Sequence, residues 1–323
     1  MRRLFAFLRR TGPRAWPGWI GAWLACCLGL LVPDRIALAA QQVLVVSSEA
    51  GGPYQAAAEA LRAELAAQGR DGLSILLRAL PELRDSELDA ATIAVTLGTA
   101  AAQRLIGSGR PIPVYCALLP RAAFELFGAE GSSPRHSAIF LDQPFPRQLN
   151  LIELLLPGRT RLLALAGDTR GASLGALTGA AADRGLRVAI ENVPNEGALF
   201  SAMTRRLAET DVLLALPDPT VLNARTVRGV LVTAYHYQVP VIAFSAAYVK
   251  AGALASVSST PVQIGVQAAR GVRQALAGRG LPAPDYPADF VVDVNETVAR
   301  SFDLQPGTPE ALRQRLLQME GKP

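Results

Sequence analysis

Short apolar runs alternate with helical stretches along most of the chain. Residues 211–216 and 239–243 form two such runs, and a helical stretch, 221–237, separates them. Runs of about five apolar residues, each followed by a short polar loop and a helix, are typical of strands in a buried parallel α/β sheet. In such sheets, ligands bind in the crevice at the carboxyl ends of the strands.

The pattern occurs twice. The first half predicts strands over 43–46, 74–77, 91–97, 113–118 and 137–141, with helices over 54–68 and 100–106. The second half predicts strands over 161–166, 187–192, 211–216, 239–243 and 290–294, with helices over 145–156, 173–184, 196–208 and 221–237. We therefore predict an α/β fold of two Rossmann-like lobes, each a parallel sheet flanked by helices.

Three segments are predicted to cross between the lobes: Asp142 to Pro144, the region of Ser258, and the proline-rich stretch 282–287. A last helix, 309–319, follows Pro306-Gly307 and is expected to pack only loosely. The predicted organisation is a signal peptide (1–39), lobe one (40–141 with 259–281), lobe two (142–258 with 282–304) and a C-terminal tail (305–323).

The first forty residues have the layout of a secretory signal. A basic segment, 2–14, precedes an apolar core, 19–32, and Ala37-Leu38-Ala39 provides an A-x-A cleavage site before Ala40. This predicts a periplasmic protein. Two alternatives stay open: an uncleaved membrane anchor, because the apolar core comes close to spanning a bilayer, and lipid attachment at Cys26.

The net charge of +5 originates in this same segment. Six of the 32 basic and one of the 27 acidic residues precede residue 40, which leaves 26 of each sign in the remainder. The mature chain has no basic run and therefore no electrostatic footprint for nucleic acid. It keeps one thiol, Cys116, which excludes an intrachain disulfide and which we expect to be a small buried hydrophobe.

Small hydroxyl side chains stand where strands end and helices begin. Ser47, Ser48 and Thr99 can cap helices, or they can help exposed N–H groups to hold a carboxylate. Asp218, between two prolines, is either a cap or the partner of a ligand ammonium. The complete predicted ligand-binding set is Ser47, Ser48, Tyr54, Gly98, Thr99, Leu118, Asp142, Asp168, Thr169, Asp218 and Ser245.

One sequence motif is compatible with an enzyme, a serine hydrolase. Residues 171–175 match G-x-S-x-G, and Ser173, Asp218 and His236 follow in the order of an α/β-hydrolase triad. Residues 167–170 separate this serine from the end of the preceding strand, however, and His236 lies within a predicted helix. The sequence also lacks a spaced metal-ligand cluster and a phosphate-binding loop, so we predict neither catalysis nor a cofactor.

Six local motifs, in order, carry a family resemblance: residues 98–103, 112–114, 148–157, 217–221, 239–243 and 252–256. Together they resemble the periplasmic substrate-binding proteins of ABC transporters with the type I two-lobe fold. More narrowly, they are similar to the subgroup that includes tryptophan- and tyrosine-binding proteins.

The resemblance implies a monomeric receptor that captures a small organic solute, an amino-acid-like one as a first guess. Such a receptor delivers its solute to an ABC permease in the inner membrane. Two loops, 118–121 and 257–261, depart from the family pattern where they are expected to line the cleft, which leaves the ligand open. These departures also motivate an alternative, a periplasmic partner of a membrane sensor or receptor in signalling.

Overall fold

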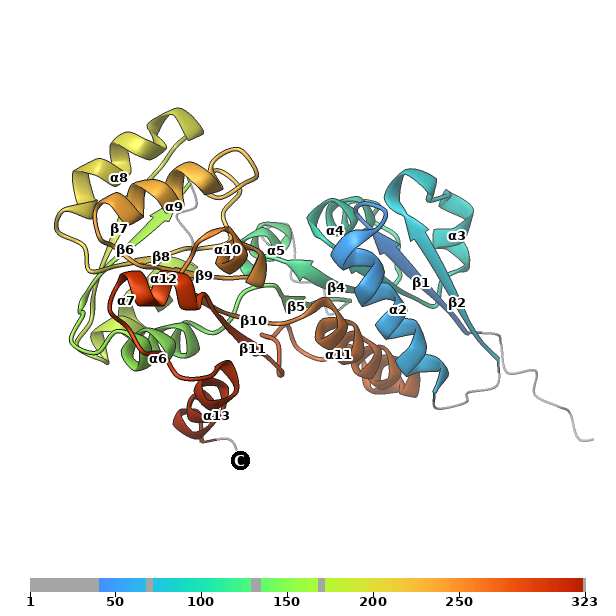
Figure 1. The fold of residues 1–323 in the computed structure, drawn as a ribbon. Coiled ribbons are helices and arrows are strands. Elements are labelled where there is room, and N and C mark those ends of the chain that lie inside the picture. The colour runs from blue at the N-terminus through green and yellow to red at the C-terminus, as the bar shows by residue number, and fades with distance from the viewer. Residues whose placement is uncertain (1–40, 68–71, 129–134, 168–171, 322–323) are drawn as a thin grey trace, which may run out of the picture. The chain divides into compact units, whose positions relative to one another are not determined.

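The computed structural model describes residues 41–67, 72–128, 135–167 and 172–321. The predicted signal peptide therefore lies outside the described residues. The strands of the described residues form two sheets (Figure 1). Among the helices of the described residues, none is long and apolar enough to cross a membrane.

The first sheet has the order β2-β1-β3-β4-β5, and all of its strands are parallel. Its strands are β1 (Gln41–Ser47), β2 (Leu73–Ala79), β3 (Ile93–Leu97), β4 (Val114–Leu119) and β5 (His136–Phe140). The helices that follow them are α2 (Gly52–Ala66), α3 (Asp85–Ala90), α4 (Thr99–Ile106) and α5 (Arg121–Gly128). A buried hydrophobic cluster lies on each face of this sheet.

Helix α11 (Pro261–Gln274) returns from the second half of the chain and packs beside α2 (Figure 1). The approach is close because Gly265 has no side chain: a Cβ there would lie 2.3 Å from the carbonyl oxygen of Ala57. A segment that is late in the sequence thus completes the core of the first sheet.

The second sheet has the order β11-β10-β9-β8-β6-β7. Its strands are β6 (Arg161–Ala166), β7 (Arg187–Asn192), β8 (Val212–Leu214), β9 (Val241–Ala243), β10 (Ala255–Ser258) and β11 (Val291–Val294). All neighbours are parallel except β10 and β11, which are antiparallel. Around it lie α6 (Phe145–Leu155), α7 (Ala172–Ala182), α8 (Leu199–Leu207), α9 (Val227–His236), α10 (Ala246–Ala251), α12 (Glu296–Ser301) and α13 (Pro309–Met319).

Hydrogen bonds join the segments that connect the two sheets, and the lobe boundaries given above stay a prediction. Residues 141–144 follow β5, and residues 259–260 lead from β10 to α11. The Gln143 side chain donates to the Ser259 hydroxyl at 2.9 Å, and that hydroxyl donates to the carbonyl of Asp289 before β11. Gln143, Ser259 and Asp289 thus join three connecting segments through two hydrogen bonds.

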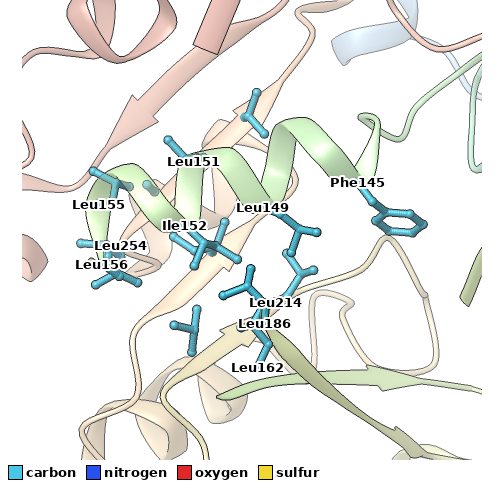
Figure 2. Close-up of a cluster of buried hydrophobic side chains, with 14 of the residues drawn as sticks. Phe145, Leu149, Leu151, Ile152, Leu155, Leu156, Leu162, Leu186, Leu214 and Leu254 are labelled. Atoms are coloured by element: carbon cyan, nitrogen blue, oxygen red, sulfur yellow. The ribbon is translucent and has the colours of Figure 1, made fainter. Parts of the chain in front are cut away.

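The C-terminal helix corrects one expectation. Leu312 and Leu316 of α13 are buried in the same cluster as α6, and α13 packs beside α6 (Figure 1). Figure 2 shows Leu149 of α6 next to Leu214 of the sheet. The prediction of a loosely packed helix was therefore wrong, because two apolar positions four residues apart give α13 a buried stripe.

Other differences concern element boundaries. The helix expected over 221–237 begins at Val227, because hydrogen-bonded turns around Asn223 and Thr226 occupy the preceding residues. Helices α3 and α5 were not predicted. Cys116 is fully buried, as expected, and burial raises the pKa of its thiol to about 12.

Candidate functional site

The loops that follow β6 and β8 are held together by one carboxylate. Asp218 accepts a hydrogen bond from the Gly167 amide (2.6 Å) through Oδ2 and one from the Thr220 amide (2.8 Å) through Oδ1. Gly167 fits against this loop closely, since a Cβ there would lie 3.0 Å from Thr220 Oγ1. Asp218 thus fixes both loops at the carboxyl end of the second sheet.

At the carboxyl end of the first sheet, Gly98 lies between β3 and α4. Its φ of 94° lies in the region that glycine favours. A Cβ on Gly98 would meet Ser48 Oγ at 2.6 Å and the ring of Tyr54 at 2.9 Å. The Ser48 hydroxyl accepts a hydrogen bond from the Ala101 amide, at the start of α4. Ser48 therefore caps a helix other than the one that follows it in sequence.

A cavity of about 370 Å³ lies at these loops. Its polar lining residues among those described are Thr99, Asp142, Asp218 and Thr220, and all five residues of the loop 216–220 line it. The rest of the wall is mainly apolar and includes Pro120, Ala122, Ala123, Leu126, Phe145 and Leu174. A mostly apolar cavity of this size with a few polar groups is typical of small-molecule sites.

Asp142 has an unusual environment within this lining. Its Oδ2 accepts a hydrogen bond from the Arg121 amide at 2.6 Å, at the start of α5. Burial nevertheless raises the pKa of the Asp142 carboxyl above its ordinary value, because desolvation outweighs the stabilisation from that amide.

Residues 70–295, more than half of the chain, match the family model for ABC transporter substrate-binding proteins. The chain belongs to this family. Its members are solute-binding receptors rather than enzymes. A comparison with curated protein sequences finds no match.

Solved structures support the same fold. One from Streptococcus pneumoniae, in complex with L-Trp, is 19% identical with a TM-score of 0.62, over 85% of this chain and 97% of that one. A ligand-free, open substrate-binding protein with adhesive properties from Clostridium difficile is 17% identical with a TM-score of 0.66, over 84% and 97%. A conserved domain protein from Vibrio cholerae is 22% identical with a TM-score of 0.62, over 85% and 98%. At these identities the likeness shows the type I binding-protein fold alone.

In this substrate-binding protein, three of the predicted ligand residues line the same cavity: Thr99, Asp142 and Asp218. Ser48, Tyr54 and Gly98 form the cluster beside Thr99 and are not among the lining residues. Asp168 and Thr169 lie outside the described residues. For all of them, a role in ligand binding stays a prediction.

The other predicted residues lie elsewhere. Leu118 is 9% exposed and packs in the core of the first sheet, where it adopts a φ of 55°. The Ser47 hydroxyl donates to the carbonyl oxygen of Arg78 at 3.4 Å, and half-buried Ser245 precedes α10. None of these three is a lining residue of the cavity.

Sequence reasoning missed the wall that α5 provides. Ala122, Ala123 and Leu126 line the cavity, whereas Phe124 and Phe127 of the same helix pack on the core of the first sheet. A helical periodicity over 121–128 is the signal that would have identified this helix. The departure from the family pattern at 118–121 does include one lining residue, Pro120.

Within the described residues, Asp218 and His236 of the considered hydrolase triad form no hydrogen bond with each other. Ser173 belongs to α7, and His236 is an exposed residue at the end of α9. The hydrogen bonds of the Asp218 carboxylate within the described residues are with backbone amides rather than with a histidine. Among those same residues, no group of three or more His, Cys, Asp or Glu side chains suits a metal ion.

Proposed function

We propose that this protein is an extracytoplasmic receptor that captures a small organic solute in the 370 Å³ cavity and delivers it to an ABC permease in the inner membrane. Membership of the substrate-binding family supports the proposal. The observation that carries it is the cavity itself, an apolar space with four polar side chains at the carboxyl ends of the sheets.

The lining comes from segments that follow strands of both sheets. Thr99 and Pro120 follow β3 and β4, whereas Gly167 and Asp218 follow β6 and β8. A solute that contacts both sets of loops stabilises the conformation in which the two sets lie close together. Solute binding therefore favours a closed state that a permease can distinguish from the empty one.

The predicted signal in residues 1–39 supports a periplasmic location, and we propose that the mature protein acts there as a monomer. An amino-acid-like solute was the first guess from the sequence. Its ammonium would bind to Asp218, and its apolar part would lie against Leu126 and Phe145.

A thermal-shift screen of the mature protein, followed by calorimetry, tests this function. The screen contains amino acids, amines, organic acids, nucleosides, short peptides and sugars. We expect at least one solute to raise the melting temperature and to bind with a stoichiometry of one, and solution scattering to show a smaller radius with that solute bound. If no class of solute binds, the proposed function is wrong.

Matched variants place the bound solute in the cavity. Ala123→Trp puts a large side chain into the lining and is expected to abolish binding. Ala63→Trp adds the same side chain at an exposed position of α2 and is expected to leave binding unchanged. A strain that lacks the protein should also lose uptake of the solute identified in this way.

A further inference from the structure

The ionisable residues of the described cavity lining are both acidic. Asp142 and Asp218 are the acidic residues in the described lining, and that lining contains no lysine, arginine or histidine. An apolar wall surrounds both carboxylates. Placing carboxylates in such surroundings is unfavourable unless a group of opposite charge compensates them.

The hydrogen-bond donors that the described residues offer to these carboxylates are neutral backbone amides. Asp142 accepts from the Arg121 amide, and Asp218 accepts from the amides of Gly167 and Thr220. Backbone amides orient a carboxylate and contribute partial charge, but they do not neutralise it. The pKa of Asp142 is raised for this reason: the cost of burying its charge exceeds the stabilisation that the amide hydrogen bond gives.

One arginine, Arg121, lies next to the lining in sequence, between Pro120 and Ala122. Its charge favours the ionised form of Asp142, but burial outweighs this effect and the pKa of Asp142 is still raised. The Arg121 guanidinium donates to Glu125 at 2.6 Å and to the Tyr286 hydroxyl at 2.9 Å. It also lies 5.9 Å from the centre of the Phe140 ring. The arginine is therefore occupied by an ion pair and by aromatic rings, and it is not a lining residue.

The remaining wall suits an apolar body. Leu126 lines the cavity and is 70% exposed, although a leucine gains free energy when it is covered. Phe145, Leu174 and Leu216 provide further apolar surface. A solute with an aliphatic or aromatic body would cover Leu126 and exclude water from the two carboxylates.

We propose that the solute is an organic cation, in which an ammonium group is attached to an apolar body and a carboxylate is not required for recognition. This inference rests on the proposed receptor function, and it replaces the zwitterionic amino acid by a simple amine. A positive head group would be the missing counter-charge of Asp142 and Asp218. The carboxylate of an amino acid would meet no basic residue in the described lining.

Calorimetry with one apolar body and four head groups tests the inference. The probes are 2-phenylethylamine, L-phenylalanine, 2-phenylethanol and 3-phenylpropionate, with the matching indole and n-hexyl series to vary the body. Within the series that binds, we expect the amine to bind at least about tenfold more tightly than the zwitterion, the alcohol and the acid. Equal or tighter binding of the amino acid or the acid would overturn the inference.

Two kinds of variant separate recognition of charge from structural damage. Asp142→Asn keeps an oxygen that can accept from the Arg121 amide, and it should weaken binding of the amine about tenfold while leaving the alcohol unchanged. Leu126→Ala should weaken both probes by a similar factor, because it removes only apolar contact. An Asp142→Asn variant that binds the amine as tightly as the wild type would contradict the proposal.

The outcomes also distinguish this inference from the function on which it rests. If a neutral or anionic solute from the broad screen binds and Ala123→Trp abolishes that binding, the receptor function stands and the cation inference fails. If no solute of any charge binds, the receptor function fails, and the inference fails with it.

Discussion

Two regions of this protein handle charge in opposite ways: the junction between α6 and α13, and the cavity. At the junction, Arg147 is 2% exposed, and its guanidinium donates to Glu320 at 2.9 Å and to Gln143 at 2.7 Å. The same guanidinium lies 4.1 Å from the centre of the Phe290 ring. In the cavity, Asp142 and Asp218 have only backbone amides as hydrogen-bond donors from the described residues.

We propose that this difference separates charges with a structural role from charges that a ligand compensates. A buried ion is tolerated when a counter-charge and additional hydrogen bonds compensate it, as they do for Arg147. At the junction, the protein itself therefore provides both the counter-charge and the hydrogen bonds of the buried arginine. Among the described residues that line the cavity, none supplies the matching positive group, which is the physical reason to propose that a solute supplies it.

Breaking the junction should have the largest effect. Arg147→Met leaves Glu320 without this partner in a mostly buried position, and we expect a loss of about 3–5 kcal/mol in the free energy of unfolding, measured by urea denaturation. As a control, Arg205→Met removes an exposed arginine from Glu191, which keeps its ion pair with Arg206, with an expected loss of about 0–1 kcal/mol. Equal losses in the two variants would contradict the assignment of Arg147 as a compensated buried charge.

A smaller effect is expected at Asp211, a carboxylate compensated at the surface. Arg161 donates to it at 2.7 Å, and mainly for this reason the pKa of Asp211 is lowered to about 2. Asp211→Asn should cost about 1 kcal/mol at pH 7, since Arg161 is half exposed and solvent screens the pair.

The pH dependence of this loss follows from the sign of the shift. Because the folded-state pKa lies below the ordinary value of 3.8, the stabilisation is present above about pH 4 and is lost as the pH falls toward 2. Urea denaturation of wild type and Asp211→Asn at pH 7 and pH 3 measures this, and the difference should be smaller at pH 3. A constant difference would show that Asp211 stabilises the fold without its charge.

The smallest effect, and one of opposite sign, is expected at Asp142 in the empty protein. Its pKa is raised in the folded state, so the fold binds this proton more tightly and loses stability as the pH rises from 3.8 through the raised value. Asp142→Asn stays neutral, and its melting temperature at pH 7 should exceed that of the wild type by about 1–3 °C. A lower melting temperature at pH 7 would show that Asp142 is structurally compensated after all.

Much of the fold could be predicted from the sequence because strands such as 161–166 are short, apolar and followed by helices. The periodicity is local, so it identifies these elements without knowledge of their neighbours. The packing of α13, by contrast, depends on elements that are distant in the sequence. Its sequence carries a narrow apolar stripe, Leu312 and Leu316, and only the arrangement of α6 and the second sheet determines that this stripe is covered.

The candidate site was predictable in part for the same reason. Asp218 and Thr99 follow strands directly, and the carboxyl ends of parallel strands meet at one edge of a sheet. The wall formed by Ala122 and Leu126 could not be found without recognising α5. The charge of the site was also hidden, because the sequence does not show that the guanidinium of Arg121 lies against Glu125 and Tyr286.

The central claim is that a positive group of the solute completes the charge of the cavity. A crystal structure of the mature protein with the most tightly bound amine of the head-group series tests it directly. We predict that the ammonium nitrogen lies within about 3 Å of a carboxylate oxygen of Asp142 or Asp218, with its apolar body against Leu126. An ammonium that faces solvent, or an amine bound outside this cavity, would contradict the account.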